Sequence, residues 1–165
     1  MRRALLAFGL ALAVFSSPAF SADPIATDTQ QVNAFIDEWH DDAAHARSRF
    51  FDKMAPGAIY IGTDKTERWT RDELKAWSKK YFERPSAWAF TPIKRNVAFS
   101  ADKQFTWFDE QLDTQMGVCQ ASGVVQRTAS GLQILHYQLS LAVPNELVDQ
   151  FKDAIRKVDA GAETK

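Results

Sequence analysis

Two stretches of the chain repeat apolar residues at the helical period of about 3.6 residues. The first runs from 27 to 51, and its spacing predicts a long amphipathic helix that bends or restarts near 46–48. The second follows Pro144 and predicts a terminal helix that has Asn145 as its N-cap and ends before Gly161. The apolar positions are Val32, Phe35, Ile36, Trp39, Ala43 and Phe50 in the first stretch and Leu147, Val148, Phe151, Ile155 and Val158 in the second.

A third helix is predicted by a capping signal. In Thr70-Arg71-Asp72-Glu73 the threonine side chain can accept a hydrogen bond from the glutamate amide, while the glutamate side chain returns to the threonine amide. We therefore expect a helix that begins at Thr70 and buries Leu74 and Trp77.

From Ala87 to Val143 the apolar pattern changes towards a period of two, with turn signals near 100–103, 113–117 and 129–131. Four antiparallel strands in a meander account for this pattern. Upstream, Pro56-Gly57 predicts a turn before a short strand over 58–61. Helices followed by a run of antiparallel strands indicate the α+β class.

The last strand of the meander has two chemically different faces. One side of an antiparallel sheet usually packs on the core. Tyr137 and Leu139 belong to the apolar face and are expected inside, whereas Ile134 and His136 are expected outside. An outward His136 is a poor candidate for a general base.

The strand over 105–112 places an acid on each face, because successive side chains of a strand point in opposite directions. We expect Glu110 rather than Asp109 inside, since Phe108 and Leu112 share its face. Burial would raise the pKa of Glu110, as a general acid or base requires, unless an arginine offsets the desolvation. The structural alternative is an ion pair with Arg68, Arg95 or Arg127.

The start of the chain predicts export. Arg2 and Arg3 precede an apolar run that is too short to span a bilayer, and small residues follow, as in a secretory signal peptide. The expected organisation is a leader over 1–21, one domain over 22–160 and a flexible tail over 161–165, in a periplasmic or secreted protein. The chain has 20 basic and 21 acidic residues and a single cysteine, Cys119. This composition favours neither a nucleic-acid partner nor a disulfide, and no stable membrane insertion is expected after cleavage.

Three segments carry a family resemblance: 59–70, Trp107-Phe108-Asp109-Glu110, and 135–145. In this order and at this spacing they resemble the SnoaL-like domain proteins of the nuclear-transport-factor-2-like (NTF2-like) superfamily. The resemblance implies a cone made of a curved antiparallel sheet, covered by N-terminal helices, with a pocket inside and a C-terminal helix. It does not name a reaction, because relatives of this fold include enzymes and non-catalytic association domains.

The first functional hypothesis is a mostly apolar pocket for a small hydrophobic ligand. The expected ligand-binding residues are Tyr60, Trp69, Trp107, Gln120, Tyr137 and Leu139. The chain shows no Gly-rich phosphate loop, and His40 and His45 are poorly spaced to share a helix face, so neither cofactor nor metal is expected.

Two further hypotheses stay open. A proton-transfer enzyme of the isomerase, cyclase, dehydratase or hydrolase type would use Glu110, Asp109 or Asp64 as general acid or base. Asp64 lies in the charged loop 62–69, where it can equally form a turn by accepting from neighbouring amides. An association domain would pair two subunits into a homodimer through the outer face of the sheet, with Ile134, His136 and Gln138.

Overall fold

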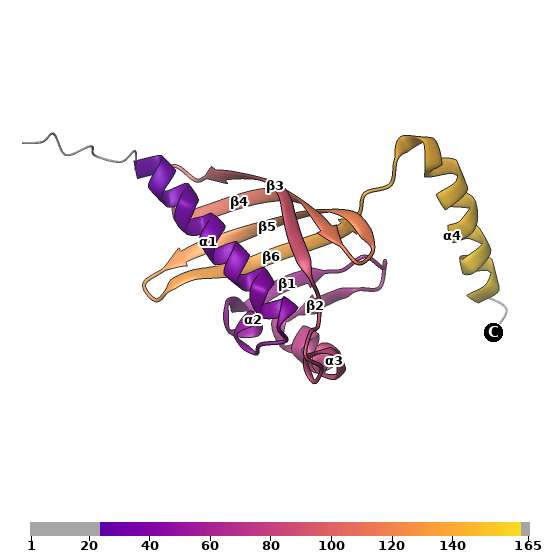
Figure 1. Cartoon of the computed structure of the whole chain (residues 1–165), viewed down its shortest axis with the longest axis horizontal. Helices are drawn as coiled ribbons and strands as arrows, with labels where there is room; N and C mark the ends of the chain where they lie inside the picture. Colours follow the sequence, from indigo (N-terminus) through magenta and orange to yellow (C-terminus); the bar gives the residue numbers. More distant parts are fainter. Residues whose placement is uncertain (1–23, 163–165) are drawn as a thin grey trace, which may run out of the picture.

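The computed structural model describes residues 24–162. The expected leader over 1–21 and the end of the expected tail, residues 163–165, lie outside the described residues. Four helices, a 3-10 turn and six strands make up the described chain (Figure 1). In chain order these are α1 (Pro24–Ala44), α2 (Arg49–Asp52), β1 (Met54–Ile61), β2 (Arg68–Thr70), α3 (Arg71–Phe82), β3 (Phe90–Phe99), β4 (Phe105–Thr114), β5 (Gly117–Thr128), β6 (Gly131–Leu141), η1 (Asn145–Leu147) and α4 (Val148–Ala162).

The first helical stretch breaks where the sequence predicts. Ala46 has a φ of 51°, in the left-handed region that ends a right-handed helix, and α2 begins three residues later. Trp39 Nε1 donates to the Phe50 carbonyl at 3.0 Å, which holds the two helices together. The buried carboxylate of Asp42 binds Lys53 and lies 2.9 Å from Arg49 Nη2, so the corner is also fixed by ion pairs.

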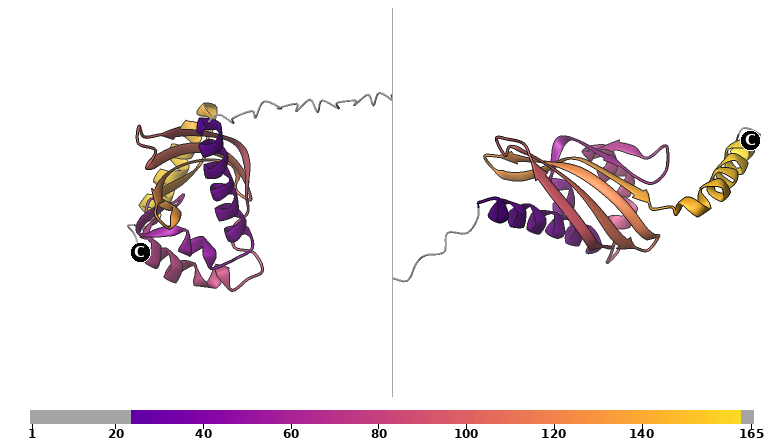
Figure 2. Two further views of the ribbon diagram at one scale, coloured as in Figure 1. Left: turned by 90° about the vertical axis from the view of Figure 1, so that its left-hand side faces the viewer. Right: turned by 90° about the horizontal axis from the view of Figure 1, so that it is seen from above.

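The six strands form one curved sheet in the order β2-β1-β6-β5-β4-β3. Only the β1–β6 pair is parallel, and the other neighbours are antiparallel. The α1 helix crosses one face of the sheet, and α2 and α3 close the end near β1 and β2 (Figures 1 and 2). The α+β architecture, with a curved sheet covered by N-terminal helices, is therefore as predicted.

The structure corrects the start of β1 and shows β2, which we did not predict. The residues Pro56-Gly57 lie within β1 rather than in a turn before it, and the β1–β6 register shifts between Met54 and Ile59. This irregularity accommodates a proline in an inner strand, where it cannot donate a ladder hydrogen bond.

A second irregularity overturns the predicted outward position of Ile134. The β5–β6 register shifts between Val124 and Val125, so that these residues oppose His136 and Ile134, respectively. Leu135 is the extra residue of this bulge, so the parity of the inward-facing residues of β6 differs before and after it. As a result Ile134 is fully buried, together with Tyr137 three residues later, and Ile134 cannot form part of an outer interface.

The capping box at the start of α3 is confirmed. The Thr70 amide donates to Glu73 Oε2 at 2.8 Å, and the Glu73 amide donates to Thr70 Oγ1 at 3.4 Å. The terminal helix α4 continues to Ala162 rather than ending before Gly161, and it projects away from the sheet (Figure 2). No helix within residues 24–162 is long and apolar enough to cross a membrane.

Candidate functional site

A buried carboxylate lies between α1 and the inner face of the sheet. Glu110 is 2% exposed and points inward from β4. Its Oε1 lies 2.7 Å from His40 Nε2 and accepts from the Tyr137 hydroxyl at 3.2 Å, while its Oε2 accepts from Arg95 Nε at 2.8 Å. An ionised carboxylate only accepts, so His40 donates through Nε2. The carboxylate therefore joins α1, β3 and β6 to β4.

Regular strand geometry and one helix face bring these groups together. Glu110 and Arg95 are opposite each other in the β3–β4 register and share the inner face. Arg95 extends beyond the carboxylate, and its Nη1 donates to Asp37 Oδ1 on α1 at 2.8 Å. His40 lies one turn beyond Ile36 on the buried face of the same helix.

Opposing effects set the pKa of Glu110. Burial, the largest effect, raises it, whereas hydrogen bonds and charge interactions with His40 and Arg95 lower it. The lowering effects prevail together, and the pKa of Glu110 lies below its ordinary value of 4.5. The pKa of Glu110 is therefore not raised, and the predicted exception applies: Arg95, together with His40, offsets the desolvation. Near neutral pH the group is an ionised acceptor that already binds three donors.

One hollow of about 510 Å³ reaches this cluster between α1 and β3. Asn33, Asp37 and His40 contribute from α1, and Phe90 and Arg95 contribute from β3. His40 is 3% exposed, and its Nδ1 has no hydrogen-bond partner among the described residues. His40, which lines the hollow, therefore has one buried ring nitrogen with free hydrogen-bonding capacity.

A second hollow, of about 170 Å³, opens beside β1, β2 and α3. Its floor is buried and its rim is exposed, with Thr63, Gln115 and Met116 at the rim. Aromatic side chains from five separate segments dominate the wall, and we call this site the aromatic hollow. The floor and wall residues are Tyr60, Gly62, Glu67, Trp69, Leu74, Trp77, Trp88, Phe90 and Leu139.

The aromatic rings of this hollow contact one another in series. Trp69 and Trp77 have ring centroids 4.5 Å apart, and Trp77 and Trp88 have centroids 6.4 Å apart and nearly parallel planes. The ring centroid of Tyr60 lies 6.4 Å from that of Trp69 and 5.4 Å from that of Tyr137. The aromatic series therefore continues towards the Glu110 cluster. Burial, together with the charge of Glu67, raises the pKa of Tyr60.

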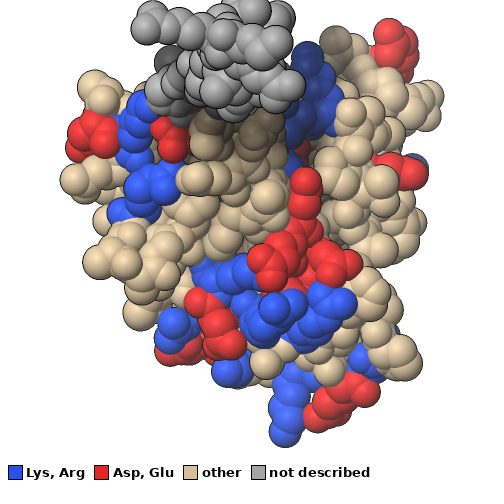
Figure 3. All heavy atoms as spheres, turned by 60° about the vertical axis from the view of Figure 1, so that its left-hand side comes forward, with Lys and Arg blue, Asp and Glu red and all other residues tan. Residues whose placement is uncertain are grey.

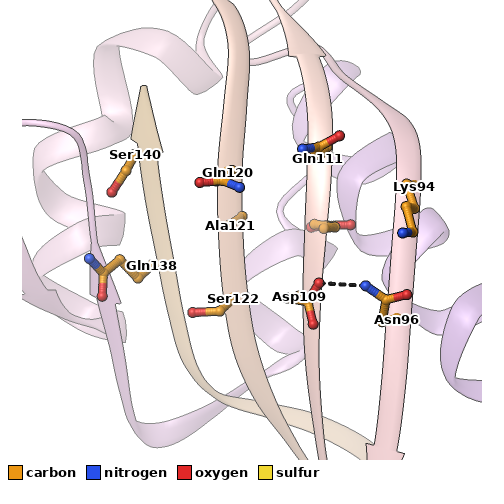
Figure 4. Close-up of a pocket in the computed structure, with 10 residues that line it drawn as sticks. Lys94, Asn96, Asp109, Gln111, Gln120, Ala121, Ser122, Gln138 and Ser140 are labelled. Atoms are coloured by element: carbon orange, nitrogen blue, oxygen red, sulfur yellow. Dashed lines mark hydrogen bonds between the residues drawn. The ribbon is translucent and has the colours of Figure 1, made fainter. Parts of the chain in front are cut away.

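The opposite face of the sheet carries a polar depression of about 510 Å³ (Figure 4). Asp109 and Gln120 lie on this outer face, and Asn96 donates to the Asp109 carboxylate at 2.7 Å. One row beyond, Trp107 pairs with Val124, and Trp107 is 52% exposed. Polar residues line most of the depression: Lys94, Asn96, Asp109, Gln111, Gln120, Ser122, Gln138 and Ser140.

Acidic and basic side chains are intermixed on the face shown in Figure 3, where neither sign forms a continuous patch. Ion pairs such as Arg47 with Asp41 and Lys103 with Asp28 occur on the surface of the described residues. Charges of opposite sign thus lie side by side on this face.

Comparison with known proteins identifies the family. A family model described as a SnoaL-like domain matches residues 32–144. The chain belongs to the SnoaL-like domain family. The match spans α1 to β6 and so includes both inner hollows. No curated protein matches this SnoaL-like chain significantly.

Solved NTF2-like structures share the fold at low sequence identity. A proposed dehydratase of the NTF2-like family from Streptomyces avermitilis superposes with a TM-score of 0.62 at 11% identity, covering 73% of this chain and 99% of that one. A proposed ketosteroid isomerase from Parabacteroides distasonis superposes with a TM-score of 0.56 at 15% identity, covering 68% of this chain and 86% of that one. A proposed calcium/calmodulin-dependent protein kinase II association domain from Xanthomonas campestris superposes with a TM-score of 0.56 at 17% identity. This superposition covers 80% of this chain and 99% of that one. These similarities support the fold alone.

The predicted ligand-binding residues of the SnoaL-like domain divide between the two faces of the sheet. Tyr60, Trp69 and Leu139 line the aromatic hollow, and Tyr137 is buried beside it. Trp107 and Gln120 do not join them. Both lie on the outer face, because Trp107 has the strand parity of Asp109 and Gln120 pairs with the outward Gln111.

The three candidate acids also separate. Glu110 faces inward and Asp109 outward, as predicted for this pair. Asp64 lies in the exposed β1–β2 loop, where its Oδ1 accepts from the Thr66 amide at 2.8 Å and from the Thr66 hydroxyl at 2.6 Å. This is the turn alternative, and the structure places Asp64 away from the Glu110 cluster.

Sequence reasoning missed His40 and Trp88 as site residues. His40 shares a helix face with Ile36 and Ala43, which was a detectable signal for a buried position. Its partner, Glu110, is 70 residues away in the sequence, so no local pattern revealed the pair. Trp88 lies in the α3–β3 linker, before β3 begins, although the alternating pattern predicted from the sequence starts at Ala87.

Proposed function

We propose that this SnoaL-like protein is an exported binding protein whose small ligand occupies the aromatic hollow. The observation that carries the proposal is the incomplete burial of three tryptophans, Trp69, Trp77 and Trp88, around one hollow with a buried floor. Trp77 is 39% exposed although it faces two other indoles. Clustered, accessible aromatic surface above a concave floor is typical of a ligand site.

The Glu110 cluster supports binding more than proton transfer by this carboxylate. Its two oxygens already accept from three side chains, and its pKa lies below the ordinary range for a glutamate. A general base near neutral pH needs a higher pKa and a free lone pair directed at the substrate. In this proposal Glu110 holds the helix and the sheet together behind the hollow.

A second candidate function rests on His40 Nδ1, the buried ring nitrogen without a partner. In a proton-transfer enzyme His40 would contact the substrate in the hollow between α1 and β3, and Glu110 would orient the ring through Nε2. The test is His40→Gln, which removes the titratable group. Under the binding proposal, this variant retains affinity at the aromatic hollow; under the enzyme alternative, it abolishes turnover.

An association role on the outer face is compatible with ligand binding. Trp107, Val124 and His136 form a row across β4, β5 and β6, with Trp107 largely exposed. We propose that this row contributes to a homodimer. Its support is the exposed indole on a face that α1 does not cover (Figure 2).

Calorimetric titration with neutral apolar probes tests the binding proposal. Cyclohexanol and benzyl alcohol are suitable, because a cavity of about 150 Å³ accepts a benzene-sized ligand. The wild type is expected to bind at least one probe, and Trp77→Ala is expected to weaken it by about tenfold. Trp107→Phe is the matched control and should bind as the wild type does. Equal binding by Trp77→Ala and the wild type would refute the assignment.

A further inference from the structure

The aromatic hollow contains a charged side chain although most of its wall is apolar. Among the residues that the structure describes, Glu67 is the only charged side chain that lines it, and no lysine, arginine or histidine of this part of the chain does so. Within residues 24–162 no basic nitrogen lies within ion-pair distance, 4.0 Å, of its carboxylate. The carboxylate accepts from the Asp64 amide at 3.2 Å, and its charge is otherwise unpaired.

The local backbone holds this carboxylate in place. The Gly62 amide donates to the Glu67 carbonyl at 2.8 Å, and the Glu67 amide donates to the Asp64 carbonyl at 2.9 Å. A Cβ at Gly62 would lie 2.2 Å from Glu67 Oε2, so the side chain packs where only a glycine leaves room. Asp64 closes the same loop through Thr66. The loop therefore fixes a half-buried acid at the hollow.

An acid beside several indole rings favours a cationic ligand over a neutral one. The π face of tryptophan attracts cations more strongly than that of any other side chain, and aromatic cages recognise quaternary ammonium groups in this way. Trp69, Trp77 and Trp88 all line the hollow that Glu67 lines. An anionic ligand would meet this carboxylate without a compensating base.

We infer that the aromatic hollow binds a small methylated ammonium group, with Glu67 as its counter-charge. This inference rests on the proposed binding function and specifies the ligand class. The volume of about 170 Å³ suits a head group the size of benzene and excludes a large polycyclic ligand. A short polar tail would extend to the rim, where Thr63 and Gln115 offer hydrogen-bonding groups.

Choline and 3,3-dimethylbutan-1-ol make a matched pair of probes, because they share a shape and differ in the charge of one central atom. Calorimetry is expected to show choline binding about tenfold or more tightly than the neutral isostere. Glu67→Gln should remove most of this preference while leaving the affinity for the isostere unchanged. Trp77→Ala should weaken both probes, and Trp107→Phe should change neither. Circular dichroism checks that each variant is folded.

The outcomes separate this inference from the proposed function. If the isostere binds as tightly as choline, or if Glu67→Gln retains the preference, the cation inference is overturned and a neutral binding site stands. If choline does not bind but benzyl alcohol or cyclohexanol does, the cation inference is likewise overturned and a neutral binding site stands. If none of the four probes binds the folded wild type, both proposals fall.

Discussion

His40 Nε2 lies 2.7 Å from Glu110 Oε1 and joins the first helix to the centre of the sheet. Both side chains are almost completely buried, at 3% and 2% exposure. Arg95 adds a second connection, since it binds Glu110 and reaches Asp37 on the same helix. The cluster therefore fixes how α1 covers the inner face of the sheet.

Breaking this cluster is expected to destabilise the fold. Glu110→Gln breaks the buried ion pair with Arg95 and leaves Arg95 only the exposed Asp37, and breaking a buried pair typically costs about 3–5 kcal/mol. Asp109→Asn is the adjacent control, since Asp109 faces outward, and it should change the free energy of unfolding by less than about 0.5 kcal/mol. Urea denaturation measures both values. A loss for Glu110→Gln no larger than that for Asp109→Asn would contradict the structural role.

The same cluster predicts acid sensitivity. The folded-state pKa of Glu110 lies below its ordinary value of 4.5, so below that pH the unfolded chain binds more protons than the folded chain. The contribution of Glu110 is therefore complete above about pH 4.5 and declines as the pH falls through the folded-state pKa. Urea denaturation at a series of pH values should give a steeper acid slope for the wild type than for Glu110→Gln. Parallel curves would show that Glu110 is not linked to folding.

The inward and outward faces of a strand were predictable from the sequence where buried and exposed residues alternate without interruption. In β4 the alternation from Phe105 to Asp113 is unbroken, and the inward position of Glu110 followed from Phe108 and Leu112. The same regularity excludes Trp107 from the interior, so placing both Trp107 and Glu110 inside was inconsistent. In β6 the bulge beside Leu135 reverses the alternation, and no residue type in that strand marks it.

The site was less predictable than the fold, because its contacts are long-range. The aromatic hollow draws on β1, β2, α3, the α3–β3 linker and the β4–β5 turn, and the sequence gives no distance between these segments. The capping box at Thr70 was visible because its partners are three residues apart. The loop that positions Glu67 was identified only as a charged junction.

Substitutions at Ile134 and Trp107 should separate an effect on the core from an effect on the proposed dimer interface. Ile134→Ala should destabilise the fold by about 2–5 kcal/mol, because it opens a cavity at a fully buried position. Trp107→Arg should leave the fold nearly unchanged and lower the mass measured by light scattering from dimer to monomer. A wild type that is monomeric at micromolar concentration would refute the proposed homodimer.

The proposed export makes a prediction that is independent of the site. The mature protein is expected to begin at Ala22 or Asp23, after removal of residues 1–21. Intact-mass measurement of protein recovered from the periplasm or the medium checks this start. Recovery of most molecules with Met1 to Ser21 retained would exclude the predicted cleavage.

The five tryptophan indole signals in a ¹H–¹⁵N correlation spectrum test the location of the ligand site most directly. On titration with choline, benzyl alcohol or cyclohexanol, the signals of Trp69, Trp77 and Trp88 should move. Trp39 should not respond, since it is buried and bonded to Phe50, nor should Trp107 on the outer face. Saturable movement of the Trp107 signal without the three hollow tryptophans would contradict the account and place the ligand on the opposite side of the sheet.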